Sequence, residues 1–399
     1  MGNITLTRRF HAVGQGLFCS EVISKNEVPV HTVVYDCGCT NTKSSYEKYL
    51  NMEIGDLAKV LNPRKIIDIL FVSHFHDDHI SGIKALFNTF SIKKVVIPQV
   101  DEVSIADAFL YNPTATHHNQ CMSVVAAFVT HDFRPLLDES TDNILRNEFS
   151  DPEVVEIPAL SEEQSMDSYR STVDRLRQNT SHGVMYIPFN IEHIGSVDFL
   201  NDFNNNSRFE VFRDALVAKD MNKVKNLFCD SAFQKDIRDL YKAYFKDVNE
   251  SSMPVLSCVC SPTFDKKTGK SSLKCQTSEE YDNDVCIKNP LSLALKHGNC
   301  LYTGDYSVKI DKNDDKMLEF YKEFITNIGI IQAPHHGARN DNPRSLYKRL
   351  NGPVSVLSYG VGNNYGHPHP IAVCQMVRAN SQIVPVSKKG ETFIVSTKI

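Results

Sequence analysis

Ser73-His74-Phe75-His76-Asp77-Asp78-His79 is the stretch that decides the fold of this chain. It has the pattern His-x-His-x-Asp-His and directly follows a mostly apolar run, 66–72, that predicts a buried strand. Residues i and i+2 of an extended backbone point the same way, so His74 and His76 can hold one metal ion.

The two residues that close this motif, Asp78 and His79, begin a helical pattern that continues over 80–89. They can therefore face a second ion beside the first. A polar loop with histidines present by chance is the alternative interpretation. The spacing of the motif, the strand before it and the helix after it all favour a metal site.

The composition is that of a globular chain of 399 residues, with 41% apolar residues, 23% charged residues and a formal net charge of −5. This acidic balance excludes a basic protein that coats nucleic acid, but it allows an enzyme that acts on one. No apolar run is long enough to predict a transmembrane helix, and residues 1–9 lack the apolar segment of a signal peptide. A cytoplasmic protein with no membrane partner is expected.

The cysteine count, eleven, is odd, and the cysteines are scattered through predicted strands. A disulfide framework is typical of short secreted chains with an even count, so buried free thiols are the better interpretation. A structural zinc site is the alternative, although the spacing is not that of a standard ribbon. Its ligands would be Cys258, Cys260, Cys275 and Cys286.

Strands and helices alternate in the first third of the chain, which predicts a layered α/β fold. The expected strands are 4–10, 16–23, 31–35, 66–72 and 93–98, and the expected helices are 46–61 and 80–89. The middle is charged and helical in period over 138–179 and 197–248, with a strand at 184–189 between them. The chain is therefore divided into the N-terminal half of a core at 1–104, a largely helical insertion at 105–250 and the C-terminal half of the core at 251–399.

Metal-type residues also follow predicted strands in the last third of the chain. These residues are Asp305, the pair His335 and His336, and His367. Sheets of α/β proteins place their ligands at the C-terminal ends of strands. We therefore expect these residues and the 74–79 loop to converge on one site.

Six short motifs are spread along the chain. They are Val13-Gly14-Gln15-Gly16, Asp36-Cys37-Gly38, the loop 74–82, Thr303-Gly304-Asp305, Pro334-His335-His336-Gly337 and Tyr365-Gly366-His367-Pro368-His369. In this order they resemble the metallo-β-lactamase superfamily, and within it most closely the soluble hydrolase (nuclease) domain of ComEC-type competence proteins. The resemblance covers about 1–100 and 285–399. It implies an αββα sandwich and leaves 105–250 unexplained.

The resemblance also implies a centre of two divalent metal ions, zinc or manganese. His74 and His76 would bind the first ion, and Asp78 and His79 would bind the second. Asp305 would bridge both ions. Bound between them, a water would lose a proton near neutral pH and attack as a hydroxide.

Two departures from the family pattern affect the rest of the ligand set. Leu17 stands where the family has an aspartate after its first motif. The separate third-motif histidine has no clear counterpart among His182, His193 and His297. His335 or His336 is therefore expected to complete the first metal site, and His367 is expected as the remaining ligand of the second ion.

Asp78, His335 and His336 are the residues expected to act in catalysis. Whichever of the two adjacent histidines does not bind metal would donate a proton to the leaving oxygen or hold the phosphate.

Three further residues are candidates for supporting roles. Arg339 and Asn364 are candidate phosphate contacts, with ordinary surface residues as an equal alternative. Asp36 is expected to accept a hydrogen bond from a ligand histidine rather than to bind metal itself.

The leading hypothesis for function is a metal-dependent phosphodiesterase, in particular a DNA nuclease that uses a metal-bridging hydroxide. The alternatives are hydrolysis of small nucleotides or cyclic oligonucleotides, hydrolysis of an acyl substrate such as a thioester or lactone, and a non-catalytic metal-stabilised binding module. The expected partner is a nucleic acid, DNA first, or a nucleotide, and a protein could dock on the 105–250 insertion. A polynucleotide favours a basic channel. The sequence offers Lys93, Lys94, Lys266, Lys267, Lys270, Lys388 and Lys389 for one.

Overall fold

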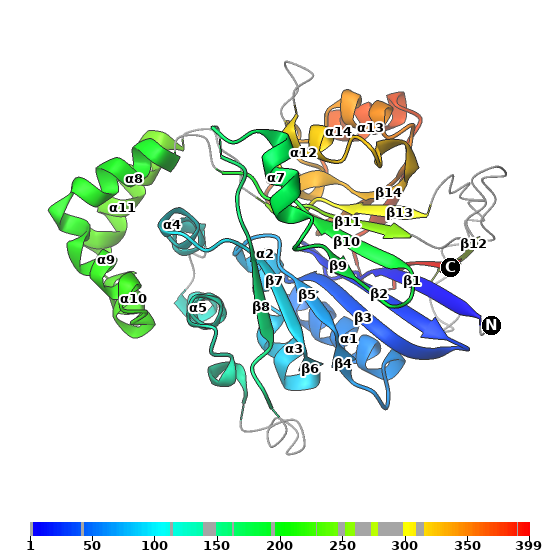
Figure 1. Cartoon of the computed structure of the whole chain (residues 1–399), viewed down its shortest axis with the longest axis horizontal. Coiled ribbons are helices and arrows are strands. Elements are labelled where there is room, and N and C mark those ends of the chain that lie inside the picture. Colours follow the sequence, from blue (N-terminus) through cyan, green and yellow to red (C-terminus); the bar gives the residue numbers. More distant parts are fainter. Residues whose placement is uncertain are drawn as a thin grey trace.

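Two mixed β-sheets lie face to face, and helices cover the outer face of each sheet (Figure 1). This arrangement confirms the αββα sandwich expected from the sequence. The computed structural model describes residues 3–40, 44–111, 115–138, 149–161, 163–192, 196–228, 230–245, 252–259, 273–277, 298–308, 315–388 and 390–399.

The first sheet joins both ends of the chain, because β1 pairs with β17. Its described strands run in the order β12 (Leu273–Thr277), β17 (Phe393–Lys398), β1 (Ile4–Phe10), β2 (Phe18–Lys25), β3 (Val28–Cys37), β5 (Ile69–Phe71), β7 (Lys94–Pro98) and β8 (Glu153–Ile157). The strands from β12 to β3 are antiparallel, and those from β3 to β8 are parallel.

The second sheet has the same mixed character. Its described strands run in the order β16 (Gln382–Val386), β15 (Val354–Ser358), β14 (Ile328–Gln332), β13 (Asn299–Tyr302), β11 (Val255–Val259), β10 (Val184–Pro188) and β9 (Gln178–Asn179). The strands from β13 to β16 are parallel. A small separate pair consists of β4 (Ile66–Ile67) and β6 (Ser91–Ile92).

Helices of the first half pack mainly on the first sheet, and those of the last third pack on the second. The former are α1 (Ser44–Val60), α2 (Asp77–Ile80), α3 (Ile83–Thr89), α4 (Glu102–Tyr111) and α5 (Ala115–Thr130). The latter are α12 (Lys316–Phe320), α13 (Arg344–Arg349) and α14 (Pro370–Arg378), joined by α7 (Met166–Val173).

Helix α1 illustrates how apolar spacing places a helix on a sheet. Tyr46, Leu50, Ile54 and Leu57 recur at intervals of three or four residues and are all buried. This spacing puts them on one face of the helix, which packs on the first sheet. Burial of each such side chain contributes about 1.5–3 kcal/mol to stability.

The C-terminal third of the insertion forms a separate group of helices at one side of the sandwich (Figure 1). The group contains α8 (Ser196–Asn205), α9 (Glu210–Val217), α10 (Met221–Phe228) and α11 (Ser231–Tyr244). Its interior is aromatic, with Phe203 stacked on Phe209 at a ring separation of 5.1 Å. Helix α4 contacts α8 and α11 and so connects this group to the sandwich.

Two parts of the sequence prediction for secondary structure need correction. The range 138–179 was expected to be helical, but it contains the strands β8 and β9 besides α7. The prediction was wrong because two of the five residues of β8 are glutamates, and its strand conformation comes from pairing with β7. The expected helix 80–89 is divided at Gly82, whose backbone N–H donates to Cys37 O over 2.8 Å. A side chain at Gly82 would strike the Cys37 side chain.

The described cysteines are free thiols, as expected. Cys19, Cys37, Cys39, Cys121, Cys258 and Cys300 are buried, and Cys374 is exposed. The zinc alternative involves the side chains of Cys260, Cys275 and Cys286, which lie outside the described residues. In the part of the chain that the structure describes, no helix has the length and apolar character needed to cross a membrane.

Asp68 ends β4 and fastens it to the neighbouring strand. Its carboxylate accepts hydrogen bonds from the Thr32 backbone N–H at 2.8 Å, from Arg64 at 2.7 Å and from Lys93 at 3.0 Å. Burial raises the pKa of Asp68, but the hydrogen bonds from Arg64 and Thr32 outweigh it, so the net pKa is lowered. The charged carboxylate therefore stabilises the folded state.

We expect Asp68→Asn to reduce the acid sensitivity of folding. A carboxyl whose pKa is lower when folded stabilises the protein above its unfolded pKa of about 3.9, and that contribution is lost as pH falls through the folded pKa. The urea midpoint should therefore differ most between variant and wild type near neutral pH and converge at low pH. Asp167→Asn, at a side chain that is 93% exposed, is the control. A constant difference at every pH would contradict this assignment.

Candidate metal centre

The C-terminal ends of parallel strands from both sheets meet at one place. The 74–79 loop follows β5 of the first sheet. Asp305 follows β13 and the turn Pro334–Gly337 follows β14, both in the second sheet. The structure brings together the loop, Asp305, His335 and His336.

Asp305 lies at the centre of the cluster, and its side chain is 2% exposed. Its Oδ1 atom is 3.1 Å from His79 Nε2 and 3.6 Å from His336 Nε2. Its Oδ2 atom is 3.7 Å from His335 Nε2 and 4.0 Å from His74 Nε2. The two oxygens of one carboxylate therefore face two different pairs of imidazoles.

Asp78 belongs to both of two groups of candidate metal-binding atoms. Asp78, His79, Asp305 and His336 each offer one atom to a first group, in which all atoms lie within 4.8 Å of one another. His74, His76 and Asp78 form a second group by the same criterion. Both groups consist only of nitrogen and oxygen donors, which suit divalent ions such as zinc and manganese.

Each histidine of the cluster has a ring nitrogen held by a second partner. The hydrogen bonds are His79 Nδ1 with Asp36 Oδ2 at 2.8 Å, His336 Nδ1 with Ser358 O at 2.9 Å, His335 Nδ1 with Asp341 Oδ2 at 3.0 Å, His74 Nδ1 with Ser73 Oγ at 2.9 Å and His76 Nε2 with Asp107 Oδ2 at 2.8 Å. Such partners fix the tautomer and orientation of metal-binding imidazoles.

The hydrogen bond expected between Asp36 and a cluster histidine is present. Asp36 is fully buried and also accepts the Ser73 backbone N–H and hydroxyl, each over 2.7 Å. Burial raises the pKa of Asp36, while His79 and Ser73 act in the opposite direction. Its backbone has a φ of 54°, a left-handed conformation that is uncommon outside glycine.

The Asp-x-Gly motif allows the end of β3 to approach the metal loop closely. A Cβ atom on Gly38 would lie 2.5 Å from the carbonyl carbon of Asp78 and from the nitrogen of His79. Only glycine fits at this position without displacing the loop.

Consecutive left-handed residues direct the two adjacent histidines to different oxygens of Asp305. His335 has a φ of 46° and His336 has a φ of 52°. The left-handed conformation costs roughly 1–2 kcal/mol per non-glycine residue. The His335 backbone N–H donates to Gly304 O over 3.0 Å, which fixes the turn beside Asp305.

The cluster leaves buried polar atoms without hydrogen-bond partners among the described residues. These atoms are His74 Nε2, His79 Nε2 and Asp305 Oδ1. Burying polar atoms without partners is costly, and such atoms in native proteins often mark a bound ion. His79 Nε2 and Asp305 Oδ1 are close, but they lack hydrogen-bond geometry. The residues present therefore fit divalent metal ions.

The charge states of His74 and Asp305 agree with this conclusion. Burial, with the neighbouring His79 and His76, lowers the pKa of His74 well below its ordinary value, so this imidazole is neutral. Burial raises the pKa of Asp305, but His79 and His335 outweigh it and lower the net pKa well below its ordinary value. Neutral imidazole and ionised carboxylate are the forms that bind metal.

His367 lies beside the cluster but outside both groups of donor atoms. Its ring centre is 5.1 Å from that of His335 and 6.3 Å from that of His336. Burial, then the neighbouring His336 and His335, lowers the pKa of His367 to about 4. The position expected for His367 beside Asp78 is taken by His336, because the left-handed turn brings its Nε2 to 3.2 Å from Asp78 Oδ2.

The two candidate phosphate contacts are exposed. Among the described residues, neither Arg339 nor Asn364 forms a hydrogen bond to the cluster. The neighbouring Asn363 instead organises the loop, because its Oδ1 accepts the backbone N–H groups of Tyr365 and His367 at 3.0 and 3.1 Å.

The candidates for a third-motif histidine contribute nothing to the described cluster. His182 lies close enough to His31 to lower the pKa of His31, and it belongs to neither donor group. His193 and His297 lie outside the described residues. Leu17 is buried, and its backbone N–H donates to Asp78 O over 2.9 Å.

Sequence reasoning missed three carboxylates near the cluster. Asp107 and Asp341 hold His76 and His335. Asp77 is half-buried, and burial beside Asp78 raises the pKa of Asp77 to about 7. Asp107 could have been found from the sequence, because it is a single acidic residue within an apolar stretch of α4. Asp341 lies in a polar loop, where an aspartate does not stand out.

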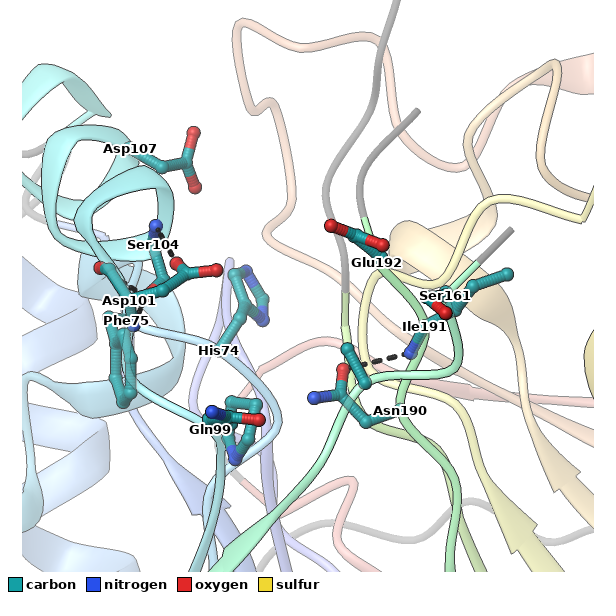
Figure 2. A pocket seen from close by; sticks show the side chains of 12 residues that line it. His74, Phe75, Gln99, Asp101, Ser104, Asp107, Ser161, Asn190, Ile191 and Glu192 are labelled. Atoms are coloured by element: carbon teal, nitrogen blue, oxygen red, sulfur yellow. Dashed lines mark hydrogen bonds between the residues drawn. The ribbon is translucent and has the colours of Figure 1, made fainter. Parts of the chain in front are cut away.

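A pocket of about 250 Å³ opens beside the cluster. His74 lies in it, with Asp107 and Ser104 on one side and Asn190 and Glu192 on the other (Figure 2). The residues that line it include three carboxylates and no lysine or arginine, since Asp101 also contributes. The pocket is therefore acidic and small.

Two facing mixed sheets with a His/Asp cluster at their strand ends define an α/β metal-binding hydrolase. The model of the metallo-β-lactamase superfamily matches residues 30–150, which include the 74–79 loop. The chain therefore has a metallo-β-lactamase fold, and its His/Asp cluster is that of a metal-dependent hydrolase.

No curated protein matches the sequence. Among solved structures, the chain is similar to the metallo-β-lactamase fold protein YhfI from Bacillus subtilis, with 10% identity and a TM-score of 0.39. The alignment covers 98% of this chain and 99% of that chain.

Proposed function

We propose that the protein is a two-metal phosphodiesterase, with DNA as its leading substrate. The observation that carries the proposal is the orientation of Asp305, whose Oδ1 faces His79 and His336 and whose Oδ2 faces His74 and His335. A carboxylate in this orientation can bridge two ions. When bound, the ions would act as Lewis acids and lower the pKa of a water molecule between them.

The residues of the chain would divide between the two ions as follows. His74, His76 and His335 would hold the first, and Asp78, His79 and His336 would hold the second. Asp36, Asp341 and Ser358 would keep three of these imidazoles in place. His367 lies next to His335 and would contact a phosphate oxygen of the substrate.

DNA leads because of the resemblance of six ordered motifs to the nuclease domain of ComEC-type proteins. Phosphoryl oxygens develop negative charge during hydrolysis, and a dinuclear centre stabilises that charge on both the attacking and the leaving side. Acyl-ester hydrolysis and metal-stabilised binding without catalysis are retained as outcomes of the test below.

A small nucleotide or cyclic oligonucleotide is the second candidate substrate. Two observations favour it over a polymer. The pocket beside His74 has a volume of about 250 Å³, which suits a compact ligand better than a polymer. The described lysines among those expected to line a basic channel are also paired with carboxylates, Lys93 with Asp68, Lys94 with Glu153 and Lys388 with Glu391.

We expect purified protein supplied with Mn²⁺ or Zn²⁺ to hydrolyse phosphodiesters. The substrates are labelled single- and double-stranded DNA, a cyclic dinucleotide and bis(p-nitrophenyl) phosphate, with a thioester and a lactone in parallel. Activity should disappear with a chelator and return when the metal is restored.

The pattern of activity separates the candidates. Cleavage of DNA supports the nuclease, and cleavage of the cyclic dinucleotide alone supports the small substrate. Hydrolysis of only the thioester or lactone would overturn the phosphodiesterase, as would a metal-loaded protein that cleaves none of these substrates.

A further inference from the structure

Helix α11 of the insertion reaches the metal centre through a chain of two hydrogen bonds. The hydroxyl of Tyr241 donates to Asp107 Oδ1 over 2.6 Å. The other oxygen of the same carboxylate, Oδ2, lies 2.8 Å from His76 Nε2. Tyr241, Asp107 and His76 are 3%, 7% and 6% exposed, so water competes little for these bonds.

This chain determines which nitrogen of His76 would face a metal ion. The Asp107 carboxylate accepts a hydrogen bond from the Nε2–H group, which leaves Nδ1 as the ligand atom. Asp107 sits on α4 and Tyr241 on α11, 134 positions apart in the sequence. The orientation of a residue in the 74–79 loop therefore depends on two helices outside it.

The helical group fixes Tyr241 by aromatic packing. Its ring lies 4.5 Å from that of Phe245 and 6.1 Å from that of Phe199, measured between ring centres. Phe199 belongs to α8, and Tyr241 itself lies on α11. Two helices of the insertion therefore fix the position of the tyrosine that donates a hydrogen bond to Asp107. The insertion is thus mechanically connected to the cluster.

We propose that Asp107 and Tyr241 are positioning residues, through which the helical insertion sets the affinity of the His74 and His76 side of the cluster for its metal ion. This inference rests on the proposed metal-dependent function. Removing the partner of a metal-binding imidazole weakens metal binding by about 10–100-fold in other metal sites.

The test is a titration of the full-length, metal-free protein with Zn²⁺ in competition with a chromophoric chelator. Asp107→Ala should weaken the binding of one of two ions by about 10–100-fold and leave the other unchanged. Tyr241→Phe removes one hydrogen bond to the carboxylate and should weaken the same ion on the order of fivefold. In the Asp107→Ala background, Tyr241→Phe should have no further effect.

Tyr244→Phe is the matched control, because Tyr244 is on the same helix and bonds Asp202 instead. It should leave both affinities unchanged. The absorption spectrum of the Co²⁺-loaded protein gives a second reading, since only the ion held by His76 should change its spectrum in Tyr241→Phe.

The outcomes separate this inference from the proposed function. Two ions in the wild type with unchanged affinities in Asp107→Ala and Tyr241→Phe would overturn the inference alone. A lower melting temperature of the metal-free variants without a change in affinity would assign the two residues a structural role only. A wild type that binds no Zn²⁺ would overturn both proposals.

Discussion

Asp305→Asn is expected to lower kcat/KM for phosphodiester hydrolysis on the order of 10³-fold or more, because one substitution weakens both metal positions. The amide keeps the size of the side chain but loses the negative charge that its two oxygens share between His79 and His74. Bound metal, measured by mass spectrometry after dialysis, should fall from two ions per chain to one or none.

A matched control is Asp315→Asn. Asp315 is also a buried aspartate, but it caps α12 by accepting the Leu318 N–H over 3.0 Å, and asparagine caps helices equally well. This variant should retain two ions and full activity. Retention of both ions and of activity in Asp305→Asn would show that Asp305 does not bridge the centre.

A second large effect is expected at the ion pair that joins the two sheets. Arg8 on β1 and Glu21 on β2 are 1% and 2% exposed, with 2.7 Å between Nε and Oε1. Burial lowers the pKa of Arg8, but the Glu21 carboxylate outweighs it and raises the net pKa. Tyr186 and Tyr302 of the second sheet donate to Glu21 over 2.7 and 2.9 Å. The Glu21 carboxylate therefore neutralises Arg8 in its own sheet and accepts hydrogen bonds from two tyrosines of the other sheet.

Glu21→Ala should lower the free energy of unfolding by about 3–5 kcal/mol, because it leaves a buried guanidinium without its counterion. Urea denaturation of the metal-free protein measures this loss without a contribution from metal binding. The double variant Arg8→Met with Glu21→Leu should recover much of the loss, since it removes both charges.

The comparison for this prediction is an ion pair at the surface. Asp56 lies 2.7 Å from Lys59, and both side chains are largely exposed. Asp56→Ala should cost only about 0–1 kcal/mol. A cost of similar size for Glu21→Ala would mean that water reaches Arg8 and that the pair does not hold the sheets together.

The sequence was sufficient to predict the parts of the site that follow from local sequence patterns. The 74–79 motif, with a strand before it and a helix after it, predicted the loop and the fold. Asp305 and the histidine pair were identified because each follows an apolar strand, and parallel strands end at one edge. The supporting hydrogen bond to Asp36 followed from the same reasoning.

The remaining parts depend on contacts that no local pattern encodes. His336 rather than His367 lies beside Asp78 because the backbone at 335 and 336 is left-handed, a conformation that histidine seldom adopts. Tyr241 meets Asp107 only after α11 has packed on α4. The strand β8 was missed because it is recognised by its partner β7 and not by its own charged sequence.

The turn that carries His335 and His336 also affects how the protein could be stabilised. Glycine or asparagine would suit its backbone better, yet neither could replace an imidazole donor. Asn342 offsets part of the backbone cost, because its amide donates to Pro334 O and Ala338 O over 2.9 and 2.7 Å. Selection for thermal stability alone is therefore expected to yield substitutions in this turn that stabilise the protein and abolish its activity.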